Sequence, residues 1–74
     1  MQDREIIEKL LDEQKEERKH QTEFITRLKG LYDKLDRGGY QPLDALRQMI
    51  DNWEQNLSLV DSQIKELEGL LKNM

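Results

Sequence analysis

The sequence lacks cysteine and contains one proline and one histidine among its 74 residues. No disulfide can stabilise this chain, and no thiolate can bind a metal. Hydrophobic residues make up 35% of the chain and charged residues 38%, a ratio that favours extended helices with a narrow apolar stripe. Because a core in a chain this short contributes only about 3–5 kcal/mol, oligomerisation is the remaining means of stabilisation.

Long hydrophobic runs and an excess of positive charge are also missing. The longest apolar runs are pairs such as Ile6-Ile7, which are too short for a membrane span or the core of a secretory signal. The net charge is −4, so the chain does not present the basic surface of a nucleic-acid-binding protein. Together with the lack of cysteine, these features predict a cytoplasmic protein that binds neither membranes nor nucleic acids.

One interruption divides the helical pattern. Gly38-Gly39 stops a helix, because glycine accepts left-handed conformations and has a high backbone entropy. Pro42 suits the first position of the next helix, where its missing N–H costs nothing. The sequence predicts one all-α domain over residues 1–74, with a helix over about 3–37, a loop over about 38–41 and a helix over about 42–73. A loop this short requires neighbouring antiparallel helices.

The second predicted helix has a sustained seven-residue repeat. Its core positions, a and d of each heptad, are all apolar: Leu43, Leu46, Ile50, Trp53, Leu57, Val60, Ile64, Leu67, Leu71 and Met74. Such a repeat indicates a left-handed coiled coil with a partner helix. We therefore expect a two-helix antiparallel coiled-coil hairpin.

The first predicted helix has a weaker repeat. Its expected core positions are Ile7, Leu10, Gln14, Glu17, Gln21, Phe24, Leu28, Leu31 and Leu35, and Ile6, Leu11, Ile25 and Tyr32 widen the stripe. Residues 12–23 contain no apolar side chain. Antiparallel folding sets Phe24 beside Trp53, and it sets Gln14, Glu17 and Gln21 opposite the apolar residues Leu57, Val60 and Ile64.

This mismatch favours a partner. Leaving an aliphatic side chain exposed forfeits about 1.5–3 kcal/mol. A second copy resolves the mismatch by forming a four-helix bundle, and a dimer with closed two-fold symmetry is the default oligomer. The expected self-association residues are Ile50, Trp53, Leu57, Val60 and Ile64, with Glu17 and Gln21 setting the register. A helix from another protein or a displaced first helix would resolve the mismatch differently.

Glu17-Arg18-Lys19-His20 resembles the Glu-x-x-His pattern of di-iron four-helix proteins. The resemblance implies an alternative function, a metal-binding bundle assembled by dimerisation, in which Glu17, His20 and Asp61 are the candidate ligands. A solvated charged face explains the same residues, and the main expectation is a protein without metal or cofactor. A second alternative is an RNA-binding hairpin dimer, similar in architecture to the plasmid-copy-number hairpin proteins.

The hairpin tip supplies a further candidate contact surface, formed by Tyr32, Asp36, Arg37 and Tyr40. Neither Ser58 nor Ser62, the only serines, has a nearby histidine or a strained turn that would activate it. We therefore predict that the chain is not an enzyme. The expected function is protein–protein interaction or oligomerisation, as a small regulator or adaptor whose partners are a second copy and a larger protein.

Overall fold

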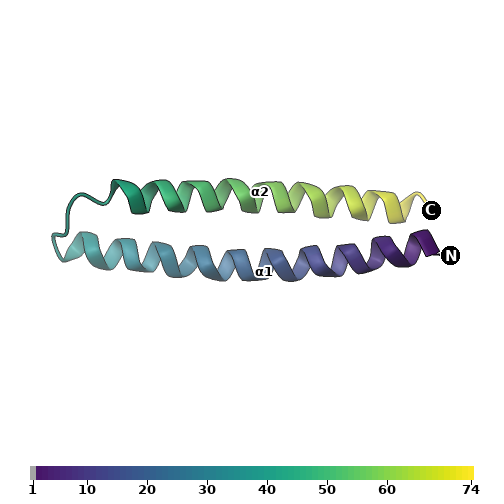
Figure 1. The fold of residues 1–74 in the computed structure, drawn as a ribbon, viewed down its shortest axis with the longest axis horizontal. Helices are drawn as coiled ribbons and strands as arrows, with labels where there is room; N and C mark the ends of the chain where they lie inside the picture. The colour runs from purple at the N-terminus through teal and green to yellow at the C-terminus, as the bar shows by residue number, and fades with distance from the viewer. Residues whose placement is uncertain (1) are drawn as a thin grey trace.

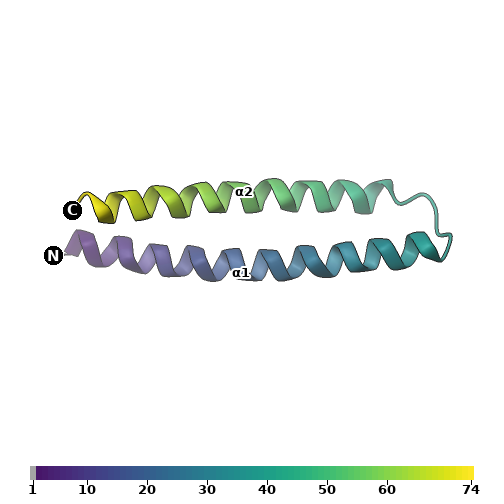
Figure 2. The ribbon, with the colours of Figure 1, turned by 180° about the vertical axis from the view of Figure 1, so that it is seen from behind.

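The computed structural model describes residues 2–74, and over them the chain is an all-helical antiparallel hairpin (Figure 1). Helix α1 spans Gln2–Arg37 and helix α2 spans Asp44–Lys72. The helices run side by side along their whole length, so the start of α1 and the end of α2 lie at the same end (Figures 1 and 2). The Cα atoms extend over 57 × 14 × 14 Å. The described chain is thus a single layer of two helices.

Helix α1 ends in a Schellman motif. The Tyr40 N–H donates to the Leu35 carbonyl at 3.0 Å, and the Gly39 N–H donates to the Asp36 carbonyl at 3.1 Å. Gly39 has a φ of 79°, the left-handed conformation that this motif requires and that glycine adopts without a steric penalty. The paired glycines therefore end the helix as the sequence indicates.

Helix α2 begins without a side-chain cap. Leu43 occupies the N-cap position and has no side-chain cap hydrogen bond, whereas its carbonyl accepts from the Arg47 N–H at 3.0 Å. Asp44 places negative charge in the first turn, where the helix dipole favours it. Pro42 precedes the helix instead of opening it, so α2 starts two residues later than the expected position 42.

A thin core lies between the helices. Its buried apolar side chains are Leu11, Ile25, Leu28, Ile50, Val60 and Ile64. The stripe predicted for α2 faces α1, since each of its core positions before Met74 is buried or half-buried. The expected pairing level is also confirmed, because the rings of Phe24 and Trp53 meet edge to face with centroids 4.9 Å apart.

The core stripe of α1 differs from the expected one. Leu10 and Leu31 are 44% and 46% exposed, whereas Leu11 and Ile25 are only 8% and 6% exposed. The positions that face α2 are Ile7, Leu11, Gln14, Arg18, Gln21, Ile25, Leu28, Tyr32 and Leu35. The expected inward positions of Leu10, Glu17 and Leu31 are therefore wrong. Arg18 replaces Glu17 in the middle of the stripe, where its guanidinium reaches across to Asp61 of α2.

The polar middle of α1 does not leave α2 uncovered. Val60 and Ile64 are 7% and 8% exposed and belong to one buried cluster with Leu11. The expectation that this part of α2 is uncovered in a single hairpin is therefore wrong. Polar side chains contribute to the cover, because Gln21 is buried and Gln14 is half-buried. The Oε1 atoms of both glutamines are buried without a hydrogen-bond partner.

Neither described helix has a stretch that combines the length and the apolar character needed to cross a bilayer.

Candidate functional site

The two long sides of the hairpin differ in chemistry. On the first side, ion pairs connect the two helices. Three ion pairs connect the helices on this side: Lys15 Nζ with Glu68 Oε2 at 4.0 Å, Lys29 Nζ with Glu54 Oε1 at 2.9 Å, and Arg18 Nε with Asp61 Oδ1. Each of these side chains is at least 40% exposed, so solvent screens the pairs and each contributes little stability. We call this side the charged face.

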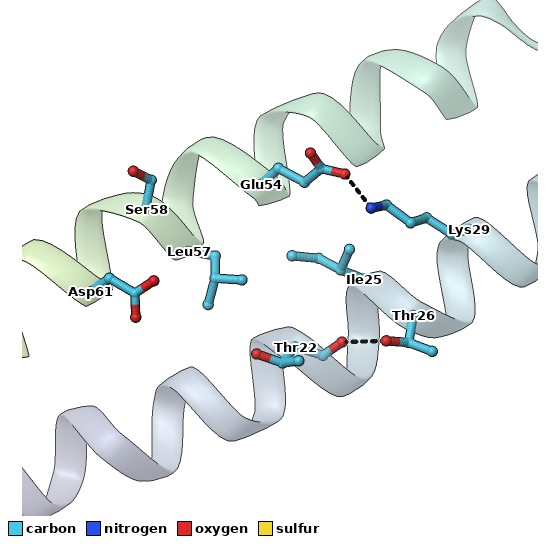
Figure 3. Close-up of a pocket in the computed structure, with 8 residues that line it drawn as sticks. All are labelled: Thr22, Ile25, Thr26, Lys29, Glu54, Leu57, Ser58 and Asp61. Atoms are coloured by element: carbon cyan, nitrogen blue, oxygen red, sulfur yellow. Dashed lines mark hydrogen bonds and ion pairs between the residues drawn. The ribbon is translucent and has the colours of Figure 1, made fainter.

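A groove lies on the charged face between the two helices (Figure 3). Ile25 and Leu57 point toward each other between the helices, and Lys29 pairs with Glu54 beside them. Asp61, the remaining charged residue of the lining, is paired with Arg18. The charges that line the groove are thus already neutralised within the chain, which makes it a poor site for a charged ligand.

The opposite side carries exposed apolar side chains, and we call it the apolar face. We define it by the exposed residues Ile6, Leu10 and Leu31 of α1 and Met49, Leu59 and Leu70 of α2, together with the half-buried Phe24 of α1. Leu10 and Leu70 line one groove together with Gln63 and Glu66. The other members follow from the helical repeat, because residues four or seven apart lie on the same side of their helix: Ile6 is four residues from Leu10, and Leu59 is four residues from Gln63. Trp53 adjoins this face through its contact with Phe24.

The segregation between the two sides is complete over the described helices. Outside the core stripe, the positions on the charged side hold only polar or charged residues: Glu5, Glu8, Asp12, Lys15, Lys19, Thr22, Thr26, Lys29, Asp33, Asp36, Asp44, Arg47, Asp51, Glu54, Ser58, Asp61, Lys65, Glu68 and Lys72. If apolar residues were placed without regard to side, about half would fall here, because the helical period treats the two flanks of a stripe equally. The sequence therefore distinguishes two flanks that a free hairpin would expose equally to water.

The hairpin also exposes more surface than a compact protein of its mass. The chain exposes 6028 Å², whereas a compact monomer of 8.9 kDa exposes about 4,800 Å². The hairpin thus exposes about 1,200 Å² more than a compact monomer of the same mass. Among the described residues, no large side chain is fully buried. Both facts follow from the single-layer shape, in which each helix has only one neighbour.

The residues expected to mediate self-association lie mostly within the hairpin core. Ile50, Val60 and Ile64 are buried against α1, and Trp53 and Leu57 are half-buried. The two expected register residues differ: Gln21 is buried, whereas Glu17 is exposed and its Oε1 accepts a hydrogen bond from Gln21 Nε2 at 3.0 Å. The structure thus uses the α2 stripe for the contact between its own two helices.

Sequence reasoning misses most of the apolar face. It assigns Leu10 and Leu31 to the core, and it gives Met49, Leu59 and Leu70 no role in association. A signal is present, because Leu10 and Leu31 occupy the same heptad position three repeats apart, and Met49 and Leu70 do the same. That signal can be used only once the core stripe of α1 has been located.

The three candidate metal ligands do not form a site within one hairpin. In residues 2–74 no group of three or more histidine or carboxylate side chains is arranged to hold a metal ion. His20 Nε2 lies 3.9 Å from Glu16 Oε2, and Asp61 is paired with Arg18. Glu17 and Asp61 therefore have partners other than His20.

The tip residues are held by local contacts. The Arg47 guanidinium lies over the Tyr32 ring, 5.7 Å from its centroid, which joins α2 to the end of α1. Asp36 Oδ1 accepts from Gln41 Nε2 at 3.2 Å, and Arg37 Nε donates to the Asp33 carbonyl at 3.3 Å. Tyr40 is 64% exposed and is therefore accessible to a partner.

Comparison of the chain with protein-family models, with curated proteins and with solved structures finds no match. The two faces of the hairpin are therefore the features that bear on its function.

Proposed function

We propose that this protein acts by helix-to-helix association, and that two copies assemble through their apolar faces into a four-helix bundle. The assembled bundle serves as a small regulator or adaptor that offers its charged outer surface to a larger protein. Association of this kind requires no cofactor and no catalytic group. The cytoplasmic location inferred from composition stays a prediction.

The observation that carries this proposal is the placement of exposed apolar residues on one side only. Leu10, Leu31, Met49, Leu59 and Leu70 are each at least 44% exposed, and they follow the same side of the hairpin along both helices. Exposed apolar residues gathered on one side of a small protein mark an interaction site more often than residues scattered over its surface do. Burial of apolar area at about 25 cal/mol per Å² is the main driving force for covering it.

The proposal is tested by measuring the solution mass with light scattering on a sizing column over a range of protein concentrations. We expect a mass near twice 8.9 kDa. The variant Leu31→Glu/Met49→Glu places one carboxylate in each helix of the apolar face, and we expect it to be monomeric. Far-UV circular dichroism of the same sample shows whether the helices remain.

A matched control carries the same change in charge elsewhere. Thr26→Glu/Gln55→Glu adds one carboxylate to each helix at exposed positions outside the apolar face, so this variant should remain dimeric. A native chain that is monomeric and helical at every concentration would refute self-association. A Leu31→Glu/Met49→Glu variant that stays dimeric would show that the copies meet elsewhere.

A further inference from the structure

The charged residues that border the apolar face are not evenly distributed along it. Glu13 and Glu66 lie toward the end where the helices begin and finish, and Glu66 shares the groove that Leu10 lines. Arg27 and Lys34 lie toward the loop, and the Arg27 guanidinium is 5.9 Å from the centroid of the Phe24 ring. The apolar face thus has an acidic half near the termini and a basic half near the loop.

We propose that the occupant of this face is a second copy turned end for end, so that the loop of each hairpin lies beside the helix termini of the other. This inference rests on the proposed function, because it specifies the arrangement of the same dimer. The two-fold axis would pass at the level of His20 in α1 and Leu59 in α2. The acidic half of each copy then faces the basic half of its partner.

A single two-fold axis matches apolar residues in both helices. In α1, Leu10 would lie level with the partner's Leu31, and in α2, Met49 would lie level with the partner's Leu70. Leu59 would meet the partner's Leu59 on the axis. These pairings are compatible only if residues 20 and 59 lie at one height in the hairpin. The ion pair between Arg18 and Asp61 places them there, because each residue of the pair is two positions from that level.

The same axis pairs opposite charges. Glu13 would lie level with the partner's Arg27 in α1, and symmetry repeats this pair at the other end of the interface. The alternative two-fold arrangement, with both loops at the same end, stacks α1 on the partner's α2. Glu13 would then lie level with the partner's Glu66, and Leu59 would face the partner's His20. Facing like charges are destabilising, so charge complementarity favours the end-for-end arrangement.

The extra exposed surface of the hairpin can be compared with the area that a stable dimer buries. A standard stable protein–protein interface buries about 800 Å² on each partner. The hairpin exposes about 1,200 Å² more than a compact monomer of its mass. This extra exposed surface, counted over all sides of the hairpin, is larger than the area that one partner contributes to such an interface.

Disulfide trapping tests the arrangement directly, because the native chain contains no cysteine. The Leu59→Cys variant should form a covalent dimer under mild oxidation, because the axis brings the two copies of this residue together. The control Gln55→Cys lies on the outer side of α2 and should stay largely unlinked. In the same-end arrangement the two Leu59 positions lie diagonally across the bundle, beyond the separation of about 7 Å that a disulfide can bridge.

Charge reversal provides a second readout. Glu13→Arg should raise the dissociation constant of the dimer about tenfold, because it disrupts two symmetry-related pairs. Adding Arg27→Glu to Glu13→Arg should restore the dissociation constant of the native dimer. The same-end arrangement predicts the opposite, since Glu13→Arg would then place a positive charge level with the partner's Glu66.

The outcomes separate this inference from the proposed function. Monomeric native protein overturns both. Dimeric native protein whose Leu59→Cys variant does not cross-link overturns only the end-for-end arrangement. A Glu13→Arg substitution that tightens the dimer does the same.

Discussion

Replacing Gln21 with leucine tests how much the polar middle of α1 costs this protein. Gln21 is only 8% exposed, and its Oε1 atom is buried without a hydrogen-bond partner. A buried polar atom left unsatisfied costs about 1–3 kcal/mol. The hydrogen bond from Gln21 Nε2 to Glu17 Oε1 returns about 0.5–1.5 kcal/mol net. Its loss leaves no buried charge, because Glu17 is exposed.

We therefore expect Gln21→Leu to stabilise the protein by about 1–2 kcal/mol, because leucine removes the unsatisfied oxygen and contributes apolar contact with α2. In a domain of this size, each kcal/mol raises the midpoint of thermal unfolding by about 4–8 °C. The assay is thermal unfolding followed by circular dichroism. The protein concentration must be held constant, because association makes the midpoint depend on it.

Gln55→Leu is the matched control. Gln55 is exposed on the outer side of α2, so the same change of side chain should alter stability by no more than about 0.5 kcal/mol. If Gln21→Leu lowered the midpoint while Gln55→Leu left it unchanged, the reasoning would be refuted. The bond between Gln21 and Glu17 would then outweigh the burial of the unsatisfied oxygen.

Three further predictions concern the helices and their ion pairs. Gly39→Ala should lower the free energy of unfolding in urea by about 1 kcal/mol, because the φ of 79° is unfavourable for alanine; an unchanged midpoint would contradict this account of the turn. Gly30→Ala should raise the free energy of unfolding by about 0.5–1 kcal/mol, since a Cβ there meets nothing within 4 Å. A loss of stability would show that the outer side of α1 is covered. A double-mutant cycle on Lys29 and Glu54 should give a coupling below about 1 kcal/mol that falls with added salt, because both side chains are well exposed. A larger, salt-independent coupling would indicate that this pair is shielded from water.

The parts of the fold that could be predicted from the sequence follow from strong local signals. The unbroken heptad repeat of α2 predicts which side of that helix is buried. The paired glycines predict the end of α1, and Gly39 fills the left-handed position of the motif. The short loop sets the pairing level, which is why Phe24 meets Trp53 as expected.

The core stripe of α1 could not be predicted in the same way. Two series share every seventh residue from Ile7 to Leu35 and differ in the one residue between each of these. One adds Leu10 and Leu31, and the other adds Leu11 and Ile25. Both are similarly apolar at the ends of the helix and polar in the middle, so hydrophobic periodicity does not separate them.

The sequence by itself determined that this chain forms two helices, where they are separated, and that they pair antiparallel, because backbone conformation and heptad spacing are local properties. Only the tertiary structure decided which flank of α1 faces water. That choice depends on contacts between helices, above all on the packing of Leu11 against Val60 and Ile64, because the exposed ion pairs contribute little stability. These contacts join residues that are far apart in the sequence. With Leu11 and Ile25 buried, Leu10 and Leu31 are left exposed on the other flank of α1.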